Sequence, residues 1–142
     1  VLDRALQDAG VERSDLFVTN AVKHFKFELR GRRRLHVKPA VGEIKACRWW
    51  LAEEIRLVQP RLVVALGATA ARSLMGRVVT VASLRGSPIP SSDGPPILVT
   101  VHPSFLLRVP DEAQRQSEYL RFVGDLRAAQ RWLAQPVART TQ

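Results

Sequence analysis

Two short segments, residues 62–66 (LVVAL) and 97–101 (ILVTV), are almost continuously apolar. Such segments are typical of strands in a parallel sheet whose two faces are both covered. Segments with apolar residues at helical spacing lie before, between and after them. This alternation predicts right-handed crossovers and a sheet enclosed by helices. The sequence therefore predicts an α/β fold, namely a three-layer α/β/α sandwich with a mostly parallel central sheet.

Further elements follow from apolar spacing and turn residues. The β-rich run at residues 16–19 predicts another strand, and a short strand is expected near residues 78–81, whereas residues 28–39 have no apolar period and are expected to form a loop. Because 142 residues is close to one average domain, we expect a single domain over residues 1–134 and a disordered tail over residues 135–142. Helices are predicted over residues 1–9, 41–59 and 68–76, and after Pro110 and Asp111.

Three strand ends are candidate ligand positions, because ligands of parallel sheets bind outside the carboxyl ends of the strands. These ends are Asn20, Gly67 and His102. The Asn20 amide offers a donor and an acceptor side by side, which suits the edge of a base, although an Asn in an ordinary turn explains it equally well. His102 is followed by Pro103 and Ser104. A neutral imidazole there can donate a hydrogen bond to a departing oxyanion, and Ser104 can hold a phosphate, although a plain turn is the alternative.

Positive charge is concentrated in one segment. The chain has 22 Lys and Arg against 13 Asp and Glu, a net charge of +9. Clustered cations suit a polyanion such as nucleic acid, although a solvated loop or a targeting patch would look the same. His36 lies inside this segment, and its charged form is disfavoured by the neighbouring cations, so it is expected to be neutral and nucleophilic near pH 7. The cations are Lys23, Lys26, Arg30, Arg32, Arg33, Arg34 and Lys38.

The single cysteine, Cys47, excludes an intramolecular disulfide framework and suggests a reducing compartment. Cys47 and His24 are both possible metal ligands, but two ligands do not make a site, and a buried helix position explains Cys47 as well. No apolar run approaches the roughly 20 residues of a membrane span, and no secretory pattern opens the chain. We therefore expect a cytoplasmic or nucleoid protein that does not enter a membrane.

Five separate blocks recur along the chain in one order: residues 18–23 (VTNAVK), 46–48 (ACR), 63–70 (VVALGATA), 85–86 (RG) and 101–108 (VHPSFLLR). Taken together, these blocks resemble family 4 uracil-DNA glycosylases, and the resemblance covers about residues 1–134. The longer loop after the Asn segment, RGRRRLHVK, and His24 in place of a family cysteine resemble the UdgX subgroup, which binds uracil-containing DNA and becomes covalently joined to it.

The resemblance implies a role for each matching residue. Asn20 would read uracil, His102 would stabilise the departing uracil anion, and His36 would attack the sugar carbon in place of water. Cys47, with His24 beside it, would be a ligand of a 4Fe-4S cluster in the full-length protein. Substrate DNA, flipped out of its stack, would contact a further set of residues. These are Ser104, Arg32, Arg33, Arg34 and Arg108.

Two family features are missing from this sequence: a Gly-Glu-Gln-Pro-Gly type loop and a Cys-x-x-Cys pair. Both precede the first helix in the family pattern, so we expect the chain to be the C-terminal two thirds of such a protein. The favoured hypothesis is a monomeric UdgX-like protein that excises uracil, preferably from single-stranded DNA, and ends as a covalent histidine–DNA adduct. The alternatives are a turning-over family 4 glycosylase and a non-catalytic, basic nucleic-acid-binding module.

Overall fold

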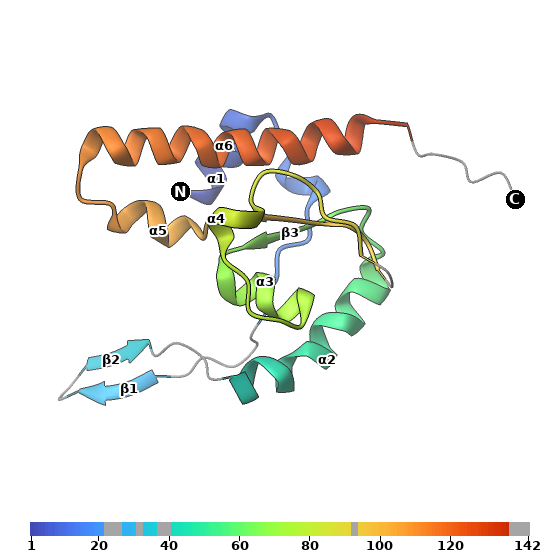
Figure 1. Cartoon of the computed structure of the whole chain (residues 1–142), viewed down its shortest axis with the longest axis horizontal. Coiled ribbons are helices and arrows are strands. Elements are labelled where there is room, and N and C mark those ends of the chain that lie inside the picture. The colour runs from blue at the N-terminus through green and yellow to red at the C-terminus, as the bar shows by residue number, and fades with distance from the viewer. Residues whose placement is uncertain (22–26, 31–32, 37–40, 92–93, 137–142) are drawn as a thin grey trace, which may run out of the picture.

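The computed structural model describes residues 1–21, 27–30, 33–36, 41–91 and 94–136. Within residues 22–48 it describes the backbone of the helices and strands but not the side chains. It is a mixed α/β structure (Figure 1), as the sequence predicts. No helix in the described ranges is long and apolar enough to cross a membrane. The elements in chain order are α1 (Leu2–Ala9), a 3-10 turn (Arg13–Asp15), β1 (Phe27–Arg30), β2 (Arg33–His36), α2 (Val41–Val58), β3 (Val63–Leu66), α3 (Ala68–Met75), α4 (Val81–Leu84), β4 (Ile97–Thr100), α5 (Pro103–Arg108) and α6 (Glu112–Ala134).

Strands β3 and β4 pair in parallel, in register from Val63 with Ile97 to Leu66 with Thr100. This confirms both strands that were predicted from the continuous apolar runs. All four β4 residues are buried, as expected for a strand covered on both faces.

Side chains of the strand pair alternate between two hydrophobic clusters. Ala65, Ile97 and Val99 pack with α3 residues, including Ala71. On the other side, Leu66 packs against the cluster of α1 and α6 residues. Helices α1 and α6 lie against each other, away from α3, in Figure 1. The parallel pair is therefore enclosed by helices on opposite faces.

Helix ends follow their capping residues. Gly10 ends α1 in a left-handed conformation, φ 75°, which glycine adopts readily after a helix, and its N–H donates to the Gln7 carbonyl. Asp111 caps α6, because its Oδ1 accepts from the Gln114 N–H at 2.8 Å. The helices predicted at residues 1–9, 41–59, 68–76 and after Asp111 are all confirmed to within a residue or two.

Three predictions about elements are wrong. Residues 16–19 form no strand, and their side chains at Leu16, Phe17 and Val18 are exposed. Residues 78–80 are irregular, and Val81 begins the short helix α4 instead. The segment predicted to be a loop holds the antiparallel pair of β1 and β2, in register from Phe27 with His36 to Arg30 with Arg33 (Figure 1).

Candidate active site

The carboxyl ends of β3 and β4 bring Gly67 and His102 into contact. The Gly67 N–H donates to the Thr100 carbonyl at 2.8 Å, which extends the parallel ladder by one residue. Gly67 has φ 94° and ψ 170°, a region almost reserved for glycine. A Cβ at Gly67 would lie 3.0 Å from the Cβ of His102. The glycine therefore lets the chain turn into α3 and leaves room for the histidine.

His102 is the N-cap of α5. Its Nδ1 accepts the backbone N–H of Ser104 at 3.1 Å and lies 2.8 Å from the Ser104 hydroxyl oxygen. Because Nδ1 uses its lone pair in this cap, the neutral ring carries its hydrogen on Nε2. The Nε2–H is therefore the ring group that remains to donate to a ligand. An exposed imidazole of this kind is suited to an oxygen that gains negative charge.

Electrostatics at this edge favour an anion and a neutral imidazole. Helix α3 begins at Gly67, and the N–H groups in the first turn of a helix carry partial positive charge. Partial burial, and secondly the charge of Arg108, lower the pKa of His102 below its ordinary value of 6.5. The neutral form of the ring is therefore favoured, and in this form Nδ1 accepts the Ser104 N–H while Nε2–H is left to donate.

We expect the lowered pKa of His102 to appear as acid sensitivity of folding. Between the pKa of the folded state and 6.5, the unfolded chain binds more protons than the folded chain, so stability rises with pH across this window. The contribution of His102 is complete above pH 6.5 and is lost as the pH falls through the lower folded value. An NMR titration of the His102 ring measures this pKa directly, and a midpoint at or above 6.5 would contradict the expectation.

Replacing Gly67 by alanine is expected to destabilise the fold and to displace His102. The backbone conformation alone costs a residue with a side chain about 1–3 kcal/mol, and the 3.0 Å approach to the His102 Cβ adds to it. Gly10→Ala is the control for a positive φ alone, since Gly10 is in the less restrictive left-handed region and a methyl group there would meet no atom within 4 Å. Urea unfolding of the two variants should show the larger loss for Gly67→Ala. Equal losses would mean that the contact with His102 is unimportant.

Of the residues predicted to bind substrate, Ser104 and Arg108 lie on the same helix as the His102 cap. The Ser104 hydroxyl is already within hydrogen-bond distance of His102, so its first role is to orient the ring. Arg108 is exposed at the last position of α5. Asn20 is exposed in the irregular stretch that follows the 3-10 turn, not at a strand end. Its convergence with His102 on one pocket stays a prediction.

The basic segment is described only in part. Arg33, Arg34 and His36 belong to β2, and their side chains lie outside the described residues. Arg32 and His24 also lie outside the described residues. Their proposed contacts with DNA and metal stay predictions.

A four-iron cluster was also expected from the resemblance. Cys47 is in α2, and its side chain is outside the described part of the chain. Such a cluster is held by four ligands, usually all cysteine thiolates, whereas this sequence contains one cysteine. Across the described residues, no group of three or more His, Cys, Asp or Glu side chains is placed to hold a metal. The single cysteine of this sequence is therefore fewer than the usual four thiolates, and the described residues add no metal-binding group.

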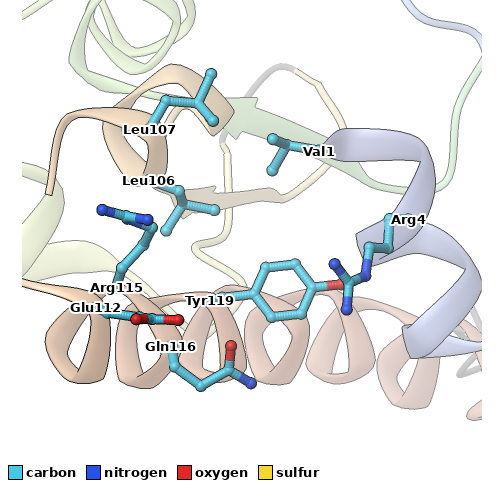
Figure 2. A pocket seen from close by; sticks show the side chains of 8 residues that line it. All are labelled: Val1, Arg4, Leu106, Leu107, Glu112, Arg115, Gln116 and Tyr119. Carbon is cyan, nitrogen blue, oxygen red and sulfur yellow. The ribbon is translucent and has the colours of Figure 1, made fainter.

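Two features of the structure were not predicted. The first is an open pocket between α1, α5 and α6, lined by Arg4, Leu107 and Tyr119 among others (Figure 2). His102 is not among its lining residues, so it is separate from the imidazole site. The second is a buried ion pair of Arg85 with Asp125. Its signal in the sequence is an acidic residue, Asp125, three positions after Phe122 on the apolar stripe of α6.

Comparison with known proteins gives consistent matches. The profile of the family described as "Uracil DNA glycosylase superfamily" matches residues 1–127. A type-4 uracil-DNA glycosylase of Thermotoga maritima is 33% identical over 124 residues, which cover 87% of this chain and 58% of that protein. A type-5 uracil-DNA glycosylase of Pyrobaculum aerophilum is 33% identical over 101 residues, or 70% of this chain and 41% of that protein. The chain thus spans about half the length of these two curated relatives.

Proposed function

This chain belongs to the uracil-DNA glycosylase superfamily, and we propose that the protein removes uracil from DNA by breaking the bond between the base and its deoxyribose. The observation that carries the proposal is the His102 cap. Its Nδ1 is occupied by Ser104, its pKa is lowered, and its Nε2–H is left to donate at the carboxyl end of β4. The matches to type-4 and type-5 enzymes support the same activity.

The proposed reaction is dissociative. The flipped uracil leaves with the electron pair of the glycosidic bond, and negative charge gathers on its carbonyl oxygens. The Nε2–H of His102 donates to one of these oxygens, and the helix N-terminus beside Gly67 adds partial positive charge. Water then adds to the sugar cation and loses a proton, which leaves an abasic site. Asn20 is proposed to pair with the edge of the uracil.

The proposed fold of the whole protein is the three-layer α/β/α sandwich. Its support is the β3–β4 pair, which has helical clusters on both faces. Further strands beside this pair would complete the central sheet. The partner is uracil-containing DNA, and the basic segment with Arg32, Arg33 and Arg34 would neutralise its phosphates.

A gel assay tests the activity. The full-length protein is incubated with single- and double-stranded oligonucleotides that carry one uracil, or thymine at the same position. Alkali then cleaves any abasic site. We expect cleavage of the uracil strands alone. Binding to all four substrates without cleavage would instead support the non-catalytic nucleic-acid-binding module.

A second candidate function is a single-turnover variant in which His36 replaces water as the nucleophile. The observation that favours it is the β1–β2 pair, which sets His36 at the end of a four-residue strand with Arg33 and Arg34. Here the neutral imidazole would bond to the sugar carbon as uracil leaves with the electron pair of the glycosidic bond, and the ring would then lose its remaining N–H proton to water or to the uracil anion. A denaturing gel of the same reactions would show a shifted protein–DNA band, absent with thymine.

His36→Ser separates the two candidates. A hydroxyl without a partner base is a poor nucleophile, so the variant should lose the shifted band while water gains access to the sugar. If wild type releases uracil repeatedly and gives no shifted band, the protein is a turning-over glycosylase. A His36→Ser protein that still forms the band would point to another nucleophile.

A further inference from the structure

A buried charged cluster joins the end of β4 to α6 and to the residue that follows α4. The Oδ2 of Asp125 lies 2.8 Å from Nη2 and 3.0 Å from Nε of Arg85, and it accepts the Thr100 hydroxyl at 2.6 Å. Thr100 is fully buried, and the side chains of Arg85 and Asp125 are 6% and 10% exposed. Glu118 lies 3.4 Å from Arg85 at the outer side of the cluster.

Thr100 connects this cluster to the imidazole site. Its side chain bonds to Asp125 of α6, while its carbonyl accepts the Gly67 N–H. Gly67 in turn lies against the Cβ of His102, two residues beyond Thr100. One residue therefore fixes the end of β4 both to the helix behind it and to the neighbouring strand end.

The backbone turn at Gly86, directly after Arg85, passes close to the Asp125 carboxylate. The Gly86 N–H donates to the Val99 carbonyl at 3.2 Å, and Gly86 has φ 92°. A Cβ at Gly86 would lie 3.2 Å from Asp125 Oδ1. The backbone thus approaches the carboxylate closely enough to restrict its orientation.

We propose that Thr100 and Asp125 are positioning residues for His102, holding the β4 end so that the imidazole stays in line with the departing base. This inference rests on the proposed glycosylase activity. Its physical reason is that a donor acts in a transition state only when it is already in place, and a shift of about 1 Å can cost roughly 100-fold in rate. A buried strand end that is held by two hydrogen bonds of Thr100 resists such a shift.

The competing explanation is that the cluster only stabilises the fold. Thr100→Val distinguishes the two, because valine keeps the shape of threonine and leaves the Arg85–Asp125 pair intact. Thr100→Ser retains the hydroxyl and serves as the rescue variant. Ile97→Val is the matched control, since Ile97 is buried at the opposite end of the same strand.

The experiment measures four quantities for each full-length variant: the midpoint of thermal unfolding, the single-turnover rate of uracil release at saturating DNA, the Kd for uracil-containing DNA, and the NMR signals of the His102 ring. We expect Thr100→Val to release uracil about 10- to 100-fold more slowly, with the Kd for uracil-containing DNA changed less than about threefold. Its His102 signals should shift, and the ring should titrate closer to the ordinary histidine value. Thr100→Ser should restore both the rate and the signals.

Ile97→Val should lower the unfolding midpoint and leave the rate and the His102 signals near those of wild type. If Thr100→Val keeps the wild-type rate and His102 spectrum, or if Ile97→Val slows release as much, the inference is overturned. Failure of the proposed activity looks different: wild type itself would then release no uracil. In that case the His102 spectra of Thr100→Val and Ile97→Val still decide whether Thr100 positions the ring.

Discussion

His102→Ala should slow uracil release in a single turnover by about 100- to 1,000-fold, the loss seen when one preorganised donor to a developing oxyanion is removed. The alanine takes away the Nε2–H that the Ser104 contact leaves to donate. Binding of uracil-containing DNA should change much less, because the donor acts mainly on charge that develops as the base departs. Rapid-quench measurement at saturating enzyme gives this rate without interference from product release.

The alanine also removes the N-cap of α5, which by itself costs about 1 kcal/mol of stability. His102→Asp is the matched control. Aspartate is a good N-cap and accepts the Ser104 N–H, but it places negative charge where negative charge must develop. This variant should therefore unfold near the wild-type temperature and still release uracil at least as slowly as His102→Ala. If His102→Ala stays within about fivefold of wild type, His102 is not the donor.

The continuous apolar runs were enough to predict β3 and β4, because a strand that is covered on both faces has apolar side chains on both. In the structure the two strands pair with each other in parallel. The same signal was misleading at residues 16–19. Leu16, Phe17 and Val18 have β-forming side chains, but in the described part of the chain they pair with no strand and stay exposed. β propensity reflects packing against neighbours, so a short run without a neighbour does not become a strand.

Strands β1 and β2 show the reverse case. Half of their residues are charged, and the segment lacks an apolar period, so the sequence predicted a loop, yet residues 27–30 and 33–36 form an antiparallel strand pair. At the site, the sequence predicted His102 at the end of β4 but not α5, whose cap occupies the ring. Spacing along one segment cannot show that a ring nitrogen binds a backbone N–H in the following turn.

The Arg85–Asp125 pair was missed for a related reason. Apolar periodicity predicts the buried face of α6 well, but it assigns no role to an acidic residue on that face, such as Asp125. Its partner is 40 residues away, and only the packing of the helix against β4 and the Arg85 turn brings the two charges together.

Removal of one member of this pair should be strongly destabilising, because it leaves the other charge buried without its partner. Arg85→Met leaves the Asp125 carboxylate buried without its cationic partner. Of the side-chain donors described above, the Thr100 hydroxyl remains. An uncompensated buried charge costs about 3–5 kcal/mol, a large fraction of the stability of a small domain. Urea unfolding followed by tryptophan fluorescence should show this loss as a lower midpoint at an unchanged slope.

The exposed pair of Arg56 with Glu53 is the natural control for Arg85→Met. Its nitrogen–oxygen distance, 2.9 Å, is close to that of the buried pair, but the two side chains are 66% and 36% exposed. Because solvent-exposed ion pairs contribute about 0–1 kcal/mol, Arg56→Met should lower the free energy of unfolding by no more than about 1 kcal/mol. The double variant Arg85→Met with Asp125→Leu should regain most of what Arg85→Met loses, since replacing both buried charges leaves neither one unpaired. A double variant as unstable as Arg85→Met would show that the loss comes from packing rather than from the unpaired carboxylate.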